Sequence, residues 1–118
     1  MADRIRVLVV EDDILIGTHI AETLTSCGYP AVLATSVADA ERELSASSYA
    51  AVVLDFRVGD DISLGFALGL QQRGIPFFFC TGSMLEDVQG SFGCARVLCK
   101  PFSDEDLAST LAEMLAAA

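Results

Sequence analysis

Short apolar runs alternate along this chain with longer segments in which apolar residues recur at helical spacing. The segments between the runs predict helices near 16–27, 37–44 and 63–73, and a last helix after residue 103. Segment 84–92 has poor periodicity, so we expect the fourth helix to be short or degenerate. The runs themselves have the length and the β-branched or aromatic content of strands, and they cover residues 5–10, 31–34, 50–54, 75–80 and 95–99.

Strands that alternate with helices predict an α/β fold with a parallel sheet covered by helices on both faces. For five strands we expect the flavodoxin-like order 2-1-3-4-5, in which strands one and three meet at the switch point. The length of 118 residues fits a single domain, residues 1–118.

Polar residues follow four of the predicted strands directly. Because the carboxyl ends of parallel strands meet at one edge of the sheet, we expect these side chains to lie close together. The residues are Glu11 and Asp12 after the first strand, Asp55 after the third, Thr81 after the fourth and Lys100 after the fifth.

This set of residue types suits phosphoryl transfer. Three crowded carboxylates repel one another, and Mg²⁺, which prefers oxygen ligands, would relieve that repulsion. A carboxylate can attack phosphorus to form an acyl phosphate, and Asp55 is the candidate nucleophile. Lys100 and the Thr81 hydroxyl would stabilise charge on the phosphoryl oxygens.

Taken singly, each residue has another interpretation. Asp55 and Thr81 could be turn or capping residues, and Lys100 could be a solvated loop lysine. The acidic run Glu11 to Asp13 could favour a helix N-terminus. The joint placement at four strand ends favours the functional interpretation.

Charge and hydropathy limit the partners. Seven basic and 17 acidic residues give a net charge of −10, which disfavours nucleic acid and anionic lipid. No apolar stretch approaches the roughly 20 residues of a membrane span, and the polar start is unlike a signal peptide. We therefore expect a cytoplasmic protein whose partners are other proteins.

The cysteines lack metal-type spacing. Cys27 and Cys80 fall in apolar patterns, which predicts reduced, buried side chains. His19 lies off the apolar face of its helix and is expected to be exposed, without a phosphorelay role.

Over essentially its whole length, the chain resembles the response-regulator receiver domains of bacterial two-component signalling. The resemblance rests on the first strand with its acid pair, Leu54-Asp55, Thr81-Gly82 and Lys100-Pro101-Phe102. It implies that a histidine kinase phosphohistidine donates to Asp55 with Mg²⁺ bound, and that the backbone carbonyl of Arg57 is a further metal ligand. It also implies a non-enzymatic acceptor that signals to a downstream protein target or phosphotransfer protein; a phosphorylation-dependent homodimer is left open.

Some positions depart from the family pattern. Gly59 stands where a proline is frequent and Ser63 where a glycine is frequent, so we expect the loop after Asp55 to be rearranged. Val97 stands where the family usually has its switch aromatic. The Arg57 side chain could gate the site, pair with an acid or point to solvent.

Three other functions compete. A phosphorylation-independent interaction module fits Val97 and the altered loop but not the complete set of acids, threonine and lysine. Phosphatases similar to haloacid dehalogenases place Asp-x-Asp after the first strand and need more chain. A flavin-binding module needs a phosphate loop where Glu11 and Asp12 would repel phosphate.

Overall fold

The computed structural model of the chain describes residues 6–58, 61–81 and 96–117. The side chains of residues 57, 61, 62, 81 and 117 are not part of that description. The predicted short fourth helix, Met84 to Phe92, therefore lies outside the described residues.

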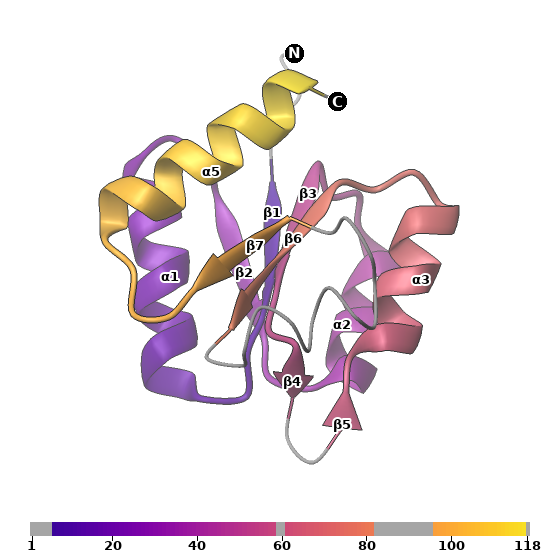
Figure 1. Cartoon of the computed structure of the whole chain (residues 1–118). Coiled ribbons are helices and arrows are strands. Elements are labelled where there is room, and N and C mark those ends of the chain that lie inside the picture. The colour runs from indigo at the N-terminus through magenta and orange to yellow at the C-terminus, as the bar shows by residue number, and fades with distance from the viewer. Residues whose placement is uncertain (1–5, 59–60, 82–95, 118) are drawn as a thin grey trace.

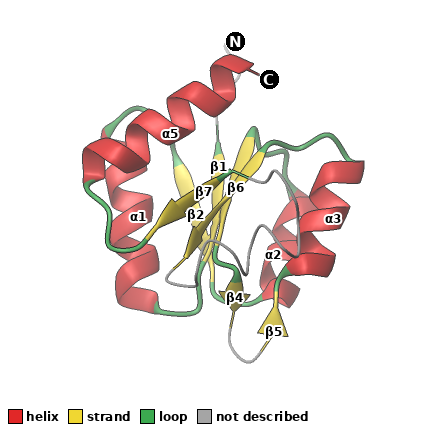
Figure 2. Cartoon of the chain, viewed as in Figure 1, coloured by secondary structure: helices red, strands yellow, loops and turns green. Residues whose placement is uncertain are grey.

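Strands and helices alternate as the hydropathy pattern predicts (Figures 1 and 2). The helices are α1 (Ile14–Ser26), α2 (Val37–Ala46), α3 (Leu64–Gln72) and α5 (Asp104–Ala117). The strands are β1 (Val7–Val10), β2 (Ala31–Ala34), β3 (Ala51–Leu54), β4 (Arg57–Val58), β5 (Asp61–Ile62), β6 (Phe77–Thr81) and β7 (Val97–Cys99).

The main sheet has the order β2-β1-β3-β6-β7, and all of its strands are parallel. This is the predicted flavodoxin-like order, so the predicted fold class is confirmed. Helices α1 and α5 cover one face of the sheet, and α2 and α3 cover the other (Figure 1). The ends of β1 and β3 are adjacent, because Val10 pairs with Leu54 in register.

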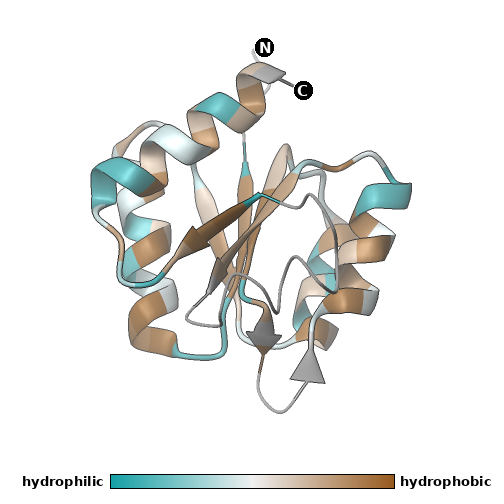
Figure 3. Cartoon of the chain, viewed as in Figure 1, coloured by the Kyte–Doolittle hydropathy of each residue, from teal (hydrophilic) through white to brown (hydrophobic). Residues whose placement is uncertain are grey.

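Two hydrophobic cores lie on the two faces of the sheet, because side chains alternate along each strand. In β1, Leu8 packs with the core under α2 and α3, whereas Val9 packs with the core under α1 and α5. Every residue of β1 and β3 is buried, as expected for the central strands of a sheet covered on both faces. In Figure 3 the strands of the main sheet are mostly hydrophobic, whereas the helices carry both hydrophobic and hydrophilic residues.

The helix ends follow the predicted capping signals. The Ser36 hydroxyl accepts a hydrogen bond from the Asp39 amide, and the Ser103 hydroxyl accepts one from the Asp106 amide, both at 3.0 Å. Gly28 has a φ of 95° just after α1, a conformation that favours glycine. These local signals therefore mark the start of α2, the start of α5 and the end of α1.

The segment after Asp55 differs from the predicted loop. Arg57 pairs with Ile62 and Val58 with Asp61, so β4 and β5 form a small antiparallel sheet. A two-residue strand has too little sequence for a periodic signal, which is why the pattern did not show it.

The predicted burial of Cys27 is wrong, because this cysteine is free but exposed. It is the C-cap of α1, one residue past the helix, where helical periodicity no longer directs a side chain toward the core. Cys80 is buried as predicted, and its burial raises the pKa of the thiol to about 12.

Candidate functional site

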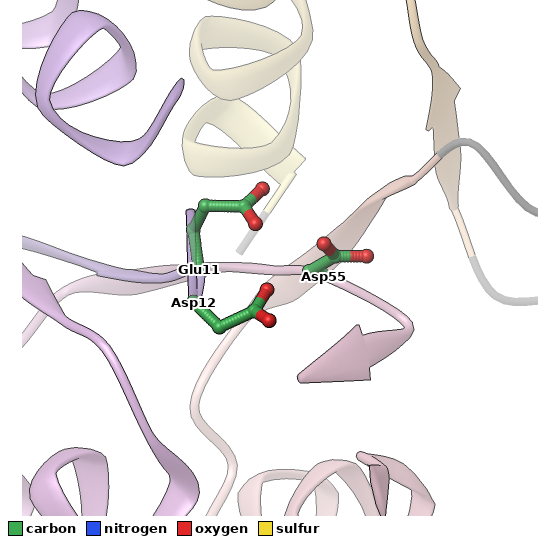
Figure 4. A group of neighbouring side chains, drawn as sticks. All are labelled: Glu11, Asp12 and Asp55. Carbon is green, nitrogen blue, oxygen red and sulfur yellow. The ribbon is translucent and has the colours of Figure 1, made fainter. Parts of the chain in front are cut away.

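Three carboxylates meet at the carboxyl edge of the sheet. Glu11 and Asp12 follow β1, Asp55 follows β3, and one oxygen from each lies within 4.8 Å of the others. Glu11 and Asp55 are buried, with 3% and 9% of their surface exposed, whereas Asp12 is exposed. Figure 4 shows the three side chains on neighbouring segments. An all-oxygen set of this kind could hold a hard divalent cation.

Lys100 reaches the same place from the end of β7. Its ammonium donates to Glu11 Oε1 at 2.5 Å and to Asp55 Oδ2 at 3.2 Å. About a fifth of the Lys100 side chain is exposed, so its charge is largely withdrawn from solvent. The interpretation of Lys100 as a solvated loop lysine is therefore wrong.

Burial and neighbouring charges both shift the pKa values of Glu11 and Lys100. Burial, together with the charge of Asp55, raises the pKa of Glu11 to about 7, although the Lys100 hydrogen bond opposes the shift. For Lys100, burial lowers the pKa, but the hydrogen bond to Glu11 and the charge of Asp55 outweigh it, and the net shift is upward. The upward shift keeps Lys100 in its charged form. The positive charge of Lys100 can then offset the negative charge of the buried carboxylates beside it.

Asp13 caps the helix that follows the acid pair. Its Oδ1 accepts hydrogen bonds from the amides of Leu15 and Ile16 at 3.0 and 3.1 Å. Glu11 Oε2 accepts from the Asp13 amide at 3.2 Å, while Glu11 Oε1 accepts from Lys100. The helix-capping role is thus filled by Asp13, and Glu11 faces the lysine.

Two other predicted site residues are placed by their backbones alone. Thr81 ends β6 and pairs with Cys99, which puts it at the same sheet edge as the carboxylates. Arg57 lies in β4, two residues past Asp55. The roles assigned to the Thr81 hydroxyl and to the Arg57 carbonyl stay predictions.

An apolar groove borders the cluster. Its volume is about 580 Å³, and Leu15, Ile16 and Ile20 of α1 line it together with Lys100, Pro101 and Phe102. Ile14 and Leu15 are 64% and 83% exposed, which is unusual for large aliphatic side chains. His19 is exposed as predicted, and its Nε2 lies 2.8 Å from Asp104 Oδ1.

Ser63 stands out in the sequence only as a departure from the family pattern. Ser63 is buried, and its hydroxyl contacts the main chain at Asp55 and Phe56. A serine before a helix resembles an ordinary N-cap in sequence. The one available signal was its position eight residues after Asp55, where a glycine is frequent in the family.

Comparison with known proteins identifies similar sequences. No protein-family model matches the chain. The transcriptional regulatory protein BasR of Escherichia coli K12 is 29% identical over 115 residues, which are 93% of this chain and 52% of BasR. The chain thus spans about half the length of the curated relatives it matches.

Two solved structures resemble the fold of this chain over nearly their whole length. The non-phosphorylated HemR receiver domain of Leptospira biflexa is 27% identical, with a TM-score of 0.80, covering 96% of this chain and 95% of that one. The response regulator protein TrrA of Thermotoga maritima, solved in complex with Mg²⁺–BeF, is 21% identical, with a TM-score of 0.82, covering 93% and 98%. In fold and in sequence, the chain is similar to response-regulator receiver domains.

Proposed function

We propose that this chain is a receiver that accepts a phosphoryl group on Asp55 with Mg²⁺ bound at the carboxylate cluster. The observation that carries the proposal is the convergence of Glu11, Asp12, Asp55 and Lys100 at one sheet edge. The similarity to receiver domains supports the same function.

The proposed metal ligands are carboxylate oxygens of Glu11, Asp12 and Asp55 and the backbone carbonyl of Arg57. Among the described side chains, Lys100 pairs with two of the three carboxylates, and an all-oxygen cluster of this kind favours a hard divalent cation. The complex of TrrA with Mg²⁺–BeF supports the choice of Mg²⁺. When bound, Mg²⁺ would neutralise charge on the phosphoryl oxygens.

In the proposed transfer, a carboxylate oxygen of Asp55 attacks phosphorus and forms an acyl phosphate. The phosphorus–nitrogen bond of a phosphohistidine breaks, and its electron pair stays on the imidazole nitrogen. Lys100 is already within hydrogen-bond distance of Asp55, so it can turn to a phosphoryl oxygen with little movement. Thr81 would donate its hydroxyl to another of these oxygens.

The phosphodonor in this proposal is a histidine kinase. The exposed apolar residues Ile14 and Leu15, beside the groove at Pro101 and Phe102, offer a surface on which a donor protein could dock next to Asp55. The kinase consumes ATP, and we therefore place the chain in the cytoplasm. The structure contributes one finding here: none of the described helices is long and apolar enough to cross a bilayer.

The signal would leave through changed contacts with a downstream protein or through onward phosphotransfer, and the chain itself would not turn over a substrate. A net charge of −10 disfavours direct contact with nucleic acid. One such changed contact would be a homodimer that assembles only when Asp55 is phosphorylated.

The test is incubation with Mg²⁺ and acetyl phosphate, followed by intact mass measurement. We expect the wild type to gain one phosphoryl group with release of acetate, and Asp55→Asn to gain none. Removal of Mg²⁺ with EDTA should abolish the gain in the wild type. An unchanged wild-type mass would contradict the proposal and favour a phosphorylation-independent interaction module. The same adduct in Asp55→Asn would contradict the assignment of Asp55 as the acceptor.

A further inference from the structure

We propose that Ser63 is a positioning residue for Asp55: its buried hydroxyl holds the main chain that follows β3 and so directs the carboxylate into the metal site. This inference rests on the proposed function, which it deepens by naming a residue that prepares the site.

The Ser63 side chain points back toward β3 and away from its own helix. Only 2% of the residue is exposed, and the hydroxyl donates to the carbonyl oxygen of Asp55 at 2.7 Å and to that of Phe56 at 3.1 Å. As the N-cap of α3, Ser63 would ordinarily accept a hydrogen bond from the first turn of the helix, and it makes none. The Ser63 hydroxyl therefore does not cap α3, and it binds the main chain at Asp55 instead.

These contacts hold Asp55 from both sides. Its amide donates to the carbonyl of Val10 in β1 at 3.0 Å, and its carbonyl accepts from the Ser63 hydroxyl. With both adjoining peptide groups fixed, the direction of the Cα–Cβ bond is fixed as well. The Asp55 carboxylate is therefore aimed at Lys100 and the other acids before any ligand arrives.

Ser63 also closes the base of the antiparallel pair β4–β5. Its amide donates to the carbonyl of Phe56 at 2.9 Å, and the pairs Arg57–Ile62 and Val58–Asp61 follow in register. Phe56 is itself anchored, because its ring packs edge-on against Phe79 with centroids 5.6 Å apart. The Arg57 carbonyl, a proposed metal ligand, therefore belongs to a segment that Ser63 holds at its base.

Loss of the hydroxyl would leave the buried Asp55 carbonyl without this donor. A hydrogen bond between buried groups stabilises the folded chain, so its loss loosens the segment that it holds. Without that hydrogen bond, the main chain at Asp55 and Arg57 would be more mobile. Binding of Mg²⁺ would then have to order this segment, which costs free energy. The affinity for Mg²⁺ should fall even though no ligand atom has been removed.

The experiment compares Mg²⁺ binding, measured by titration calorimetry with Mg²⁺ alone, in the wild type, Ser63→Ala and Ser36→Ala. Ser36 is the matched control because it also stands at the N-cap of a helix, where its hydroxyl accepts from the Asp39 amide of α2. We expect both variants to lose stability in urea, but only Ser63→Ala to lose Mg²⁺ affinity, by about three- to tenfold. Ser63→Thr keeps the hydroxyl and should recover most of that affinity.

The outcomes separate this inference from the proposed function. If the wild type binds Mg²⁺ and Ser63→Ala binds it equally well, or if Ser36→Ala loses as much affinity, the positioning role of Ser63 is overturned and the proposed function stands. If the wild type binds no Mg²⁺ and takes up no phosphoryl group, the proposed function is overturned and this inference with it. Should Ser63→Ala fail to fold, Ser63→Gly allows the same comparison.

Discussion

Lys100 and Glu11 lie 89 residues apart in the chain, and the Lys100 ammonium is 2.5 Å from Glu11 Oε1. The same ammonium is 3.2 Å from Asp55 Oδ2, so one cation bridges the residues that follow β1 and β3. The positive charge of Lys100 thus offsets part of the negative charge of the acid cluster. Its removal should therefore affect both the stability of the fold and the affinity for metal.

Lys100→Met should destabilise the protein by about 2 kcal/mol. Removing one partner of a buried ion pair typically costs about 3–5 kcal/mol, and protonation of Glu11 together with the partial exposure of Lys100 should reduce that figure. Urea unfolding at pH 7.5 measures the change. Glu11→Gln in the same background removes the unpaired carboxylate and should recover part of the loss; strictly additive losses would contradict a direct interaction.

The same Lys100→Met variant should bind Mg²⁺ more tightly than the wild type. The lysine places a like charge beside the proposed metal ligands, and removal of such a charge near the protein surface is worth on the order of 1 kcal/mol. We expect roughly a fivefold gain in affinity by calorimetry, while phosphorylation by acetyl phosphate becomes slower. Equal or weaker Mg²⁺ binding would show that Lys100 does not oppose the metal.

Gly17→Ala should destabilise the protein, although alanine usually strengthens a helix. A Cβ at Gly17 would lie 2.5 Å from Leu33 Cδ1 and 3.3 Å from Glu11 Cβ, so the Leu33 side chain or α1 itself would have to shift. We expect a loss of about 1 kcal/mol and a change in Mg²⁺ affinity through Glu11.

Gly65→Ala and Gly69→Ala in α3 are the controls for that substitution. A Cβ at either position meets nothing within 4 Å, so each variant should gain about 0.5–1 kcal/mol in urea unfolding. A gain of similar size for Gly17→Ala would mean that Leu33 moves aside freely and that Gly17 is not required for packing.

Tyr49 should contribute a pH-dependent part of the stability at alkaline pH. Burial, followed by the 2.5 Å hydrogen bond to Glu43, raises the pKa of Tyr49 to about 12. Because the unfolded tyrosine ionises first, the contribution is complete below about pH 10 and is lost as the pH rises toward 12. The melting temperature of the wild type should therefore fall toward that of Tyr49→Phe over this range; a constant difference between the two would contradict the raised pKa.

Local features of the sequence predicted the elements well. The caps at Ser36 and Ser103 depend on residues three positions apart, and the buried strands β1 and β3 depend on short apolar runs. Hydrogen-bonding groups and hydrophobic period act over a few residues, so a single sequence displays them. The alternation of these elements then restricted the topology to a parallel sheet, and the order 2-1-3-4-5 followed as the leading choice.

The sequence by itself thus determined the α/β architecture and the sheet edge at which Glu11, Asp12, Asp55 and Lys100 gather. Only the tertiary structure decided that Lys100 reaches Glu11 as well as Asp55, and that the Ser63 hydroxyl turns away from its helix toward the Asp55 carbonyl. The physical reason is that such contacts depend on side-chain rotamers and on the packing between distant segments. Side-chain rotamers and long-range packing produce no periodic pattern in the neighbouring sequence, so the sequence alone does not show them.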